Sequence, residues 1–468
     1  MKRMIFLIIF FILSILVFAS ESRLGGFGYL NLFESFGTSY LIDDPFNIVS
    51  IPGYVNVDYN YLIVEPKPGG VAFVNTYGVL KYSIDSLLTK FNLAIILNYP
   101  YLELAEIPNI TTGVPAGFFV PGTTSLQNFS INDNLRDRID LVLGVGSVFG
   151  IKFVKPYIGL GYASDYSIST SATYSGDNIQ QTSTNLESIY QYKFIIGGVF
   201  DLGFISLDAN IKTYLPYAEN STKVYYLTVQ NYVNSREHKT TGAFGIDIFL
   251  QPRLNLGKSY ILGVARYFNY QLLSEQITKR DTDGNGVFEE NTSIINNIFR
   301  VIINLGASYN FSIDNIFVSA GFSISSLNYS RVLKAGGYVN VPQSATNANE
   351  YNTQDVSTYL PVFVSFEVPL VDWFYLRAGF SKIAYQDFFS VVDGKKFDNR
   401  VTSYDNSSPL STLSLGFSLK PLKSLSLDWV VSYNFVNNVL VNGRLPWIIS
   451  GNNFFDNVTS QFSVEYRM

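Results

Sequence analysis

Apolar residues alternate with polar or small residues along most of this chain, and the alternation limits what the chain can fold into. It recurs in separate segments from about Tyr54 to Met468. In residues 301–312, one face carries Val301, Ile303, Leu305, Ala307, Tyr309 and Phe311, and the other carries Asn304, Gly306, Ser308, Asn310 and Ser312. A period of two is typical of a β-strand with two unlike faces. Because no segment after residue 20 shows a convincing helical period, the sequence predicts an all-β fold.

The connections between these segments alternate in length. Short connections such as 150–154 and 312–314 join segments into hairpins, and longer polar stretches such as 170–188 and 216–239 separate the hairpins. Outer-membrane barrels have short periplasmic turns on one rim and long extracellular loops on the other, whereas a soluble sandwich has no reason to sort its loops by length. We therefore predict a transmembrane antiparallel up-and-down β-barrel. The segmentation gives sixteen strands, with fourteen as the alternative because the first two segments are the least regular.

The N-terminus has the pattern of a secretory signal peptide. Lys2 and Arg3 precede an apolar run that ends in the small residues Ala19 and Ser20. A retained membrane anchor, the alternative, needs about 20 apolar residues, and this run is shorter. We expect a signal peptide over 1–20, an N-terminal segment over 21–53 and the barrel over 54–468, located in a bacterial outer membrane.

The composition fits a protein whose solvent is partly lipid. Hydrophobic residues make up 47% of the chain, aromatic residues 16% and charged residues only 15%. In a barrel the apolar face of each strand contacts outer-membrane lipid, the aromatic residues supply the interfacial girdles, and closure leaves no unpaired strand edge. The charged residues that strand parity places on the inward face, where they line or plug a wet lumen, are Asp140, Asp208, Lys212, Asp247, Arg253, Glu367, Arg377, Lys420 and Asp428.

Several classes of function are excluded by what the chain lacks. It contains no Cys and one His, so disulfides, thiolate metal sites and multi-histidine metal centres are impossible. Its formal net charge of −5 does not favour binding to the negatively charged backbone of nucleic acid, so the sequence predicts no nucleic-acid partner. The single imidazole, His238, lies near the predicted outer rim without a nucleophile motif. We predict neither an enzyme nor a cofactor-binding protein.

The last segment resembles the C-terminal signal that the barrel-assembly machinery recognises in outer-membrane proteins. Its apolar face carries Phe462, Val464, Tyr466 and Met468 and ends at the chain terminus. Such signals usually end in Phe or Trp, so Met468 is a departure. The resemblance implies the assembly machinery as a partner.

A short stretch before the barrel, residues 43–53, resembles one near the start of FadL-like outer-membrane channels. The family has two Asp residues, a short spacer and an Asn-Pro-Ala-Gly sequence. Asp43, Asp44 and Pro52 match, whereas Ile51 stands where the family has Asn and Gly53 where it has Ala.

The resemblance implies that the N-terminal segment folds into the barrel as a plug, with Asp43, Asp44, Asn47, Pro52 and Gly53 in it. It also implies passive uptake of small, hydrophobic cargo. A flexible periplasmic leader is the alternative for the segment. A general diffusion porin and a structural or adhesive barrel are the alternatives for the function.

One polar loop follows the spacing of a calcium-binding loop. The residues at positions 1, 3, 5, 7 and 9 are Asp281, Asp283, Asn285, Val287 and Glu289. Gly286 stands at position 6, where the turn is sharp, but Thr292 replaces the bidentate Glu of position 12. A calcium ion here would stiffen an outer loop. An exposed acidic turn is the alternative reading.

Overall fold

The computed structural model describes most of the barrel wall and part of the segment before it. The described residues are 41, 44, 47–48, 51–66, 76–85, 89–97, 131–148, 153–175, 178–226, 233–280, 290–313, 315–336, 350–392, 395–398, 411–422, 424–432 and 462–468. The predicted signal peptide, Asp43 and the calcium-loop residues Asp281, Asp283, Asn285, Val287 and Glu289 lie outside them.

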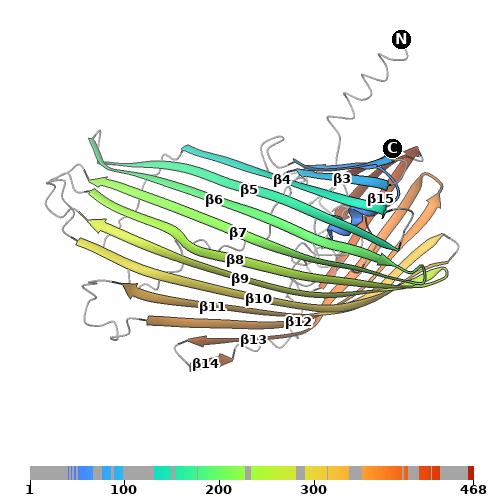
Figure 1. The fold of residues 1–468 in the computed structure, drawn as a ribbon. Coiled ribbons are helices and arrows are strands. Elements are labelled where there is room, and N and C mark those ends of the chain that lie inside the picture. Colours follow the sequence, from blue (N-terminus) through green and yellow to red (C-terminus); the bar gives the residue numbers. More distant parts are fainter. Residues whose placement is uncertain are drawn as a thin grey trace, which may run out of the picture.

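The wall is a single antiparallel sheet that closes on itself (Figure 1). Its strands are β1 (Tyr61–Pro66), β2 (Thr76–Asp85), β3 (Thr89–Leu97), β4 (Ile131–Val148), β5 (Val154–Ser175), β6 (Asn178–Asp201), β7 (Ile205–Tyr226), β8 (Val233–Leu256), β9 (Ser259–Arg280), β10 (Glu290–Ile313), β11 (Ile316–Gly336), β12 (Glu350–Val371), β13 (Phe374–Val392), β14 (Lys395–Asp398), β15 (Ser411–Leu422), β16 (Leu425–Ser432) and β17 (Phe462–Arg467).

The closed sheet has sixteen strand positions around its circumference, as the segmentation predicts. Each strand pairs with its sequence neighbour, and β17 pairs with β1 to close the ring. The strands β14 and β15 both pair with β13, but with different parts of it, so together they occupy one of the sixteen strand positions. The predicted up-and-down barrel is therefore confirmed.

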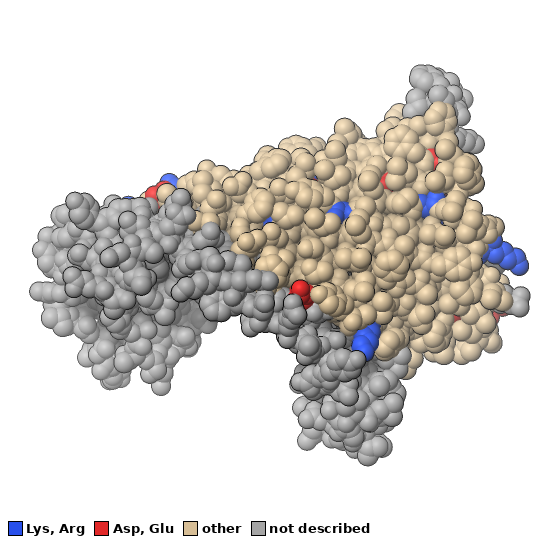
Figure 2. Space-filling view, turned by 90° about the horizontal axis from the view of Figure 1, so that it is seen from below, with Lys and Arg blue, Asp and Glu red and all other residues tan. Residues whose placement is uncertain are grey.

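The faces of the strands follow the predicted parity. On β10, Ile303, Leu305 and Tyr309 are exposed on the outside, whereas Asn304 and Ser308 are buried inside. Figure 2 shows the described outer surface as almost uncharged, with only scattered basic and acidic side chains. A wall of this kind is suited to hydrocarbon on its outer face.

No helix among the described residues is long and apolar enough to cross a membrane.

Short turns gather at one end of the barrel, called here the short-turn end. Two of them place a glycine at positive φ, Gly203 at 84° and Gly257 at 75°, and a third places Asn315 at 72°. Glycine and asparagine tolerate this left-handed conformation, which explains why these residues connect the strands. The C-terminus lies at the same end, where the Met468 amide donates to the Asn60 carbonyl at 3.0 Å.

The prediction of long polar loops at the other end is wrong for both of the stretches named above. The stretch 170–188 belongs mostly to β5 and β6, and the stretch 216–239 belongs mostly to β7 and β8. The pairing runs unbroken from Thr170↔Thr184 to Ser175↔Asn178, apart from one irregularity. These strand ends lack apolar alternation because a strand beyond the hydrocarbon layer needs no lipid-facing side. Alternation therefore marks the membrane-spanning part of a strand but not its full length.

The first strand is also shorter than predicted. The alternation predicts a strand from Tyr54, but β1 begins at Tyr61, and Pro52–Asn56 forms a 3₁₀ turn, η4, inside the barrel. Pro52 starts this turn, where its fixed φ suits helical geometry. All five η4 residues are buried.

Candidate functional site

The described residues between 41 and 60, which are 41, 44, 47–48 and 51–60 and are called here the crossing segment, contact opposite sides of the lumen wall. At its start, the Leu41 carbonyl accepts hydrogen bonds from Ser308 Oγ at 2.6 Å and Asn310 Nδ2 at 3.5 Å, both on β10. Further along, Asn56 Oδ1 accepts from Asn92 Nδ2 on β3 at 2.9 Å. The strands β3 and β10 lie on nearly opposite sides of the ring, so the segment spans the lumen.

The exit of the crossing segment is fixed at the short-turn end by Lys81. This buried side chain on β2 donates from Nζ to the carbonyls of Val57 at 2.6 Å and Tyr59 at 2.9 Å, and to Ser83 Oγ at 2.5 Å. Burying an ammonium is costly unless its donors are satisfied, and these three acceptors satisfy them. Lys81 thus ties the crossing segment to the wall just before β1 begins.

A hydrophobic cluster packs the crossing segment against the inner face of the wall. The segment contributes Leu41, Ile48, Ile51 and Val55, all fully buried. The wall contributes Tyr61, Ile63, Val79, Ala94, Ile96, Val142, Tyr157, Ile195, Phe249, Val264, Phe363 and Ile383. Full burial of each aliphatic side chain contributes about 1.5–3 kcal/mol. The cluster therefore joins the crossing segment to strands around most of the ring.

The structure places four of the five predicted plug residues inside the barrel. Asp44 and Asn47 are buried, and the Asn47 amide donates to the Asp44 carbonyl at 2.9 Å. Pro52 and Gly53 lie in η4, where Gly53 packs directly against Asp208. A Cβ at position 53 would lie 1.6 Å from Asp208 Oδ2, so this contact requires glycine. It gives a local reason for Gly53 where FadL-like proteins have Ala.

The predicted lumen-lining charges all face the inside of the barrel. Seven of them are buried, and Arg253 and Lys420 are half-buried and line cavities. The buried ones are Asp140, Asp208, Lys212, Asp247, Glu367, Arg377 and Asp428.

Six of these seven buried charges belong to three compact ion-pair groups, and Asp208 accepts a hydrogen bond from Tyr157 instead. Asp140 accepts from Lys193 Nζ at 2.7 Å. Asp247 binds Arg266 through two contacts of 2.9 Å and lies 3.6 Å from Lys212 Nζ. Arg377 bridges Glu367, at 2.5 Å, and Asp428. Charges this deep need such pairing, because an uncompensated charge in a dry interior is strongly destabilising.

Sequence reasoning missed three partners in these contacts. Lys193 and Arg266 each complete an ion pair, and the Tyr157 hydroxyl donates to Asp208 Oδ1 at 2.5 Å. The alternation of faces along the strand could have placed Lys193 on the inward face, because Lys193 lies between the outward-facing Tyr192 and Phe194.

A second apolar cluster, called here the aromatic patch, lines β7, β9 and β10 farther from the short-turn end. Its buried members are Tyr214, Phe268, Tyr270, Leu272, Ile298 and Ile302. The rings of Phe268 and Tyr270 stack with centroids 6.3 Å apart and planes 9° from parallel. Arg266 lies below, with its guanidinium carbon 5.5 Å from the Phe268 centroid. The inner wall therefore changes from apolar to charged along these strands.

A cavity of about 490 Å³ lies beside the crossing segment at the short-turn end. The segment lines it with residues from Gly53 to Tyr59, and the facing wall contributes Lys155, Asp201, Asp208 and Arg253. The crossing segment is therefore packed into the hydrophobic cluster through its apolar side chains and borders open space where it faces this cavity.

The remaining predicted residues lie away from this region. His238 is on β8, where it pairs with Asn220 and Gln276 in the sheet. On β17, Tyr466 and Met468 are exposed on the outer face, Val464 is buried, and Phe462 pairs with Trp429 in the sheet. Within the described part of the chain, no group of three His, Asp or Glu residues could hold a metal ion.

No protein-family model matches the chain, and no curated protein matches it. Among solved structures, the chain is similar to the ferric-catecholate import receptor Fiu of E. coli K12, at 9% identity and a TM-score of 0.26, with 88% of this chain and 82% of that one covered. It is also similar to the FrpB iron transporter of Neisseria meningitidis, at 9% identity and a TM-score of 0.28, with 91% and 83% covered. Likenesses of this size carry no inference about function, so the functional argument rests on the barrel itself.

Proposed function

We propose that the protein is an outer-membrane channel for passive uptake of small hydrophobic molecules, and that the crossing segment gates it. The observation that supports the proposal is the hydrophobic cluster in which Leu41, Ile48, Ile51 and Val55 pack against wall side chains from most of the ring. In this proposal, that packing closes the lumen. A general diffusion porin works through an open, water-filled lumen, and this closure does not suit that alternative.

The aromatic patch supports a hydrophobic cargo. Phe268, Tyr270 and Leu272 are buried in this conformation, so a cargo gains the free energy of burying apolar surface against them once the groups that cover them move aside. Taken together, the ion-pair groups nearer the short-turn end carry no net charge, because the extra cation of the Asp247 group offsets the extra carboxylate of the Arg377 group. This suits a lumen with no strong bias for one sign of ion. The resemblance of residues 43–53 to FadL-like channels points to the same class of cargo.

Gating requires at least part of the crossing segment to move away from the wall residues that it contacts. The stretch from Gly53 to Tyr59 borders the 490 Å³ cavity, so it has space to move once the hydrogen bonds from Lys81 to its Val57 and Tyr59 carbonyls break. Its attachment to β3 depends on the hydrogen bond between Asn56 and Asn92. A covalent link at that point would hold the gate shut.

A crosslinking experiment tests this gate, since the chain has no native cysteine to interfere. Asn56→Cys with Asn92→Cys joins the crossing segment to β3. Ser83→Cys with Asn92→Cys is the matched control, because Ser83 and Asn92 are hydrogen-bonded partners on neighbouring wall strands. Both pairs are bridged with a short reducible thiol crosslinker in cells that carry the barrel in their outer membrane.

The measured quantity is uptake of a labelled aromatic hydrocarbon, compared with cells that lack the protein. We expect the 56–92 link to stop the protein-dependent uptake and a reductant to restore it, while the 83–92 link changes nothing. Undiminished uptake through the linked 56–92 protein would refute gating by the crossing segment. Absence of any protein-dependent uptake would refute the proposal that the cargo is hydrophobic.

A further inference from the structure

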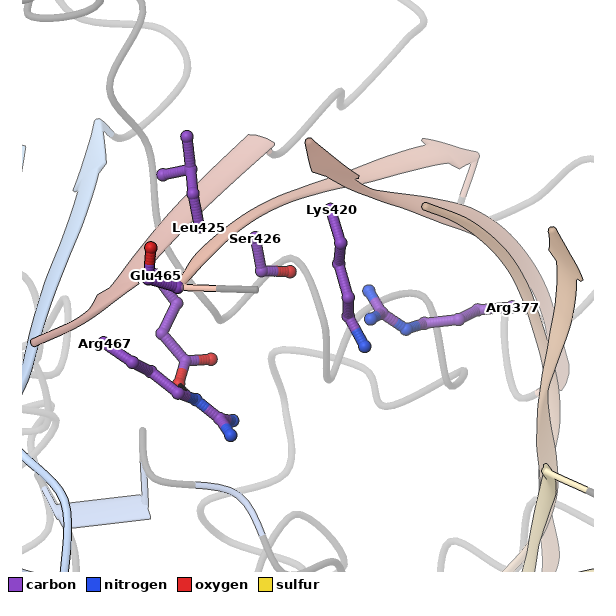
Figure 3. Close-up of a pocket in the computed structure, with 7 residues that line it drawn as sticks. Arg377, Lys420, Leu425, Ser426, Glu465 and Arg467 are labelled. Atoms are coloured by element: carbon purple, nitrogen blue, oxygen red, sulfur yellow. Dashed lines mark hydrogen bonds and ion pairs between the residues drawn. The ribbon is translucent and has the colours of Figure 1, made fainter. Parts of the chain in front are cut away.

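A small cavity at the short-turn end is lined by three cations and one carboxylate, and two further carboxylates, Glu367 and Asp428, bind one of these cations from outside the lining. It has a volume of about 120 Å³ and lies against the inner faces of β13, β15, β16 and β17 (Figure 3). Its lining comprises Arg377, Lys420, Ser424, Leu425, Ser426, Glu465 and Arg467. Three cations thus face one carboxylate, and two serine hydroxyls add neutral donors. Figure 3 shows Arg377 and Lys420 reaching toward one another from neighbouring strands.

The cations are held in place by contacts that lie to the side of or behind the cavity. Arg377 is fixed by Glu367 and Asp428, neither of which lines the cavity. Lys420 Nζ lies 3.7 Å from the centroid of the Tyr375 ring. Arg467 binds Glu465 through Nε at 2.6 Å and lies over the Tyr59 ring. Groups held in this way bind a ligand without losing much side-chain freedom.

We propose that this cavity is a binding site for a small oxyanion, either a carboxylate or a phosphate group. A space of this size holds a few water molecules or one such group. Guanidinium, ammonium and hydroxyl donors are the groups that bind oxyanions through strong, charge-assisted hydrogen bonds. None of the lining residues belongs to the crossing segment or to the aromatic patch, so this proposal does not depend on the proposed uptake function.

Arg467 connects this site to the crossing segment. Its guanidinium carbon lies 4.6 Å from the centroid of Tyr59, and its backbone amide donates to the Ser424 carbonyl at 2.7 Å. An anion bound to Arg467 would therefore lie next to the last residues of the crossing segment.

Anion titration of the full chain, folded in detergent micelles, tests the site. The probes are sodium phosphate and sodium acetate, with sodium chloride at matched ionic strength as the reference, and the readout is the midpoint of thermal unfolding. We expect phosphate or acetate, but not chloride, to raise the midpoint saturably. The stronger of the two probes identifies the preferred group.

Two variants locate the binding. Lys420→Gln should weaken the apparent affinity about tenfold, since it removes one charge-assisted contact. Lys258→Gln, which removes an exposed charge from another short turn, should leave it unchanged. Heat-modifiable gel mobility verifies folding, and if Lys420→Gln does not fold, Ser426→Ala takes its place with all charges intact. An equal effect of chloride, or wild-type affinity in Lys420→Gln and Ser426→Ala, would overturn the site.

Discussion

Gly53 has no room for a side chain, because the Asp208 carboxylate occupies the space where a Cβ would lie. We expect Gly53→Ala to destabilise the folded barrel by about 1–3 kcal/mol, the usual cost of overpacking. The measurement is urea unfolding in micelles, followed by tryptophan fluorescence. Asp208→Ala in the same chain should relieve most of the additional cost of Gly53→Ala. Strictly additive effects of the two changes would contradict the contact.

The pair of Asp140 and Lys193 offers a second residue-level prediction. Both side chains are buried, with Nζ and Oδ2 2.7 Å apart. Lys193→Met alone should cost about 3–5 kcal/mol in the free energy of unfolding, because it leaves a buried carboxylate without its cation. Combining it with Asp140→Leu should recover most of that loss. If the double variant is no more stable than Lys193→Met, the pair is not the source of the effect.

Strand parity predicted the inward charges but not their pairing. Asp140 and Lys193 lie on β4 and β6, with β5 between them, and the choice of partner depends on register and tilt of the assembled sheet. The contact of Gly53 with Asp208 joins segments far apart in the sequence, and no local pattern encodes it.

At the scale of elements, the polar outer parts of β7 and β8 are expected to be dispensable for folding. They pair from Glu219↔Lys239 outward, beyond the part of each strand where apolar residues alternate. Replacing residues 220–238 with a two-residue Asn-Gly turn should leave the barrel folded and heat-modifiable, since the membrane-spanning sheet lies below the deletion. The same replacement of residues 206–214, within the spanning part of β7, is the control and should abolish folding. Failure of the 220–238 variant to fold would show that the outer strands are part of the folding unit.

The crossing segment is the element that the sequence described least well. Residues 54–56 alternate weakly, which suggested a strand, but all three are buried because they meet wall side chains rather than lipid and water. Period-two reasoning assumes one wet and one lipid face, and it fails where an element is enclosed on all sides.

For the whole molecule, closure of the sheet and the number of strands around it were predictable, because every spanning strand repeats the same two-faced pattern. The lumen was not, because its filling depends on which far-apart segments meet inside the ring. Leu41 and Ser308 form a hydrogen bond across most of the chain, and their sequences contain no sign of it.

The central claim is that the crossing segment closes the lumen, and single-channel conductance in planar lipid bilayers tests it most directly. We expect the intact chain to show no large steady conductance. The variant Ile48→Asn with Ile51→Asn should open frequently, since it places amides in the hydrophobic cluster. Leu62→Asn with Leu80→Asn, on the lipid-facing side of β1 and β2, is the control and should not open the lumen. A large, steady, water-filled conductance in the intact chain would contradict the account.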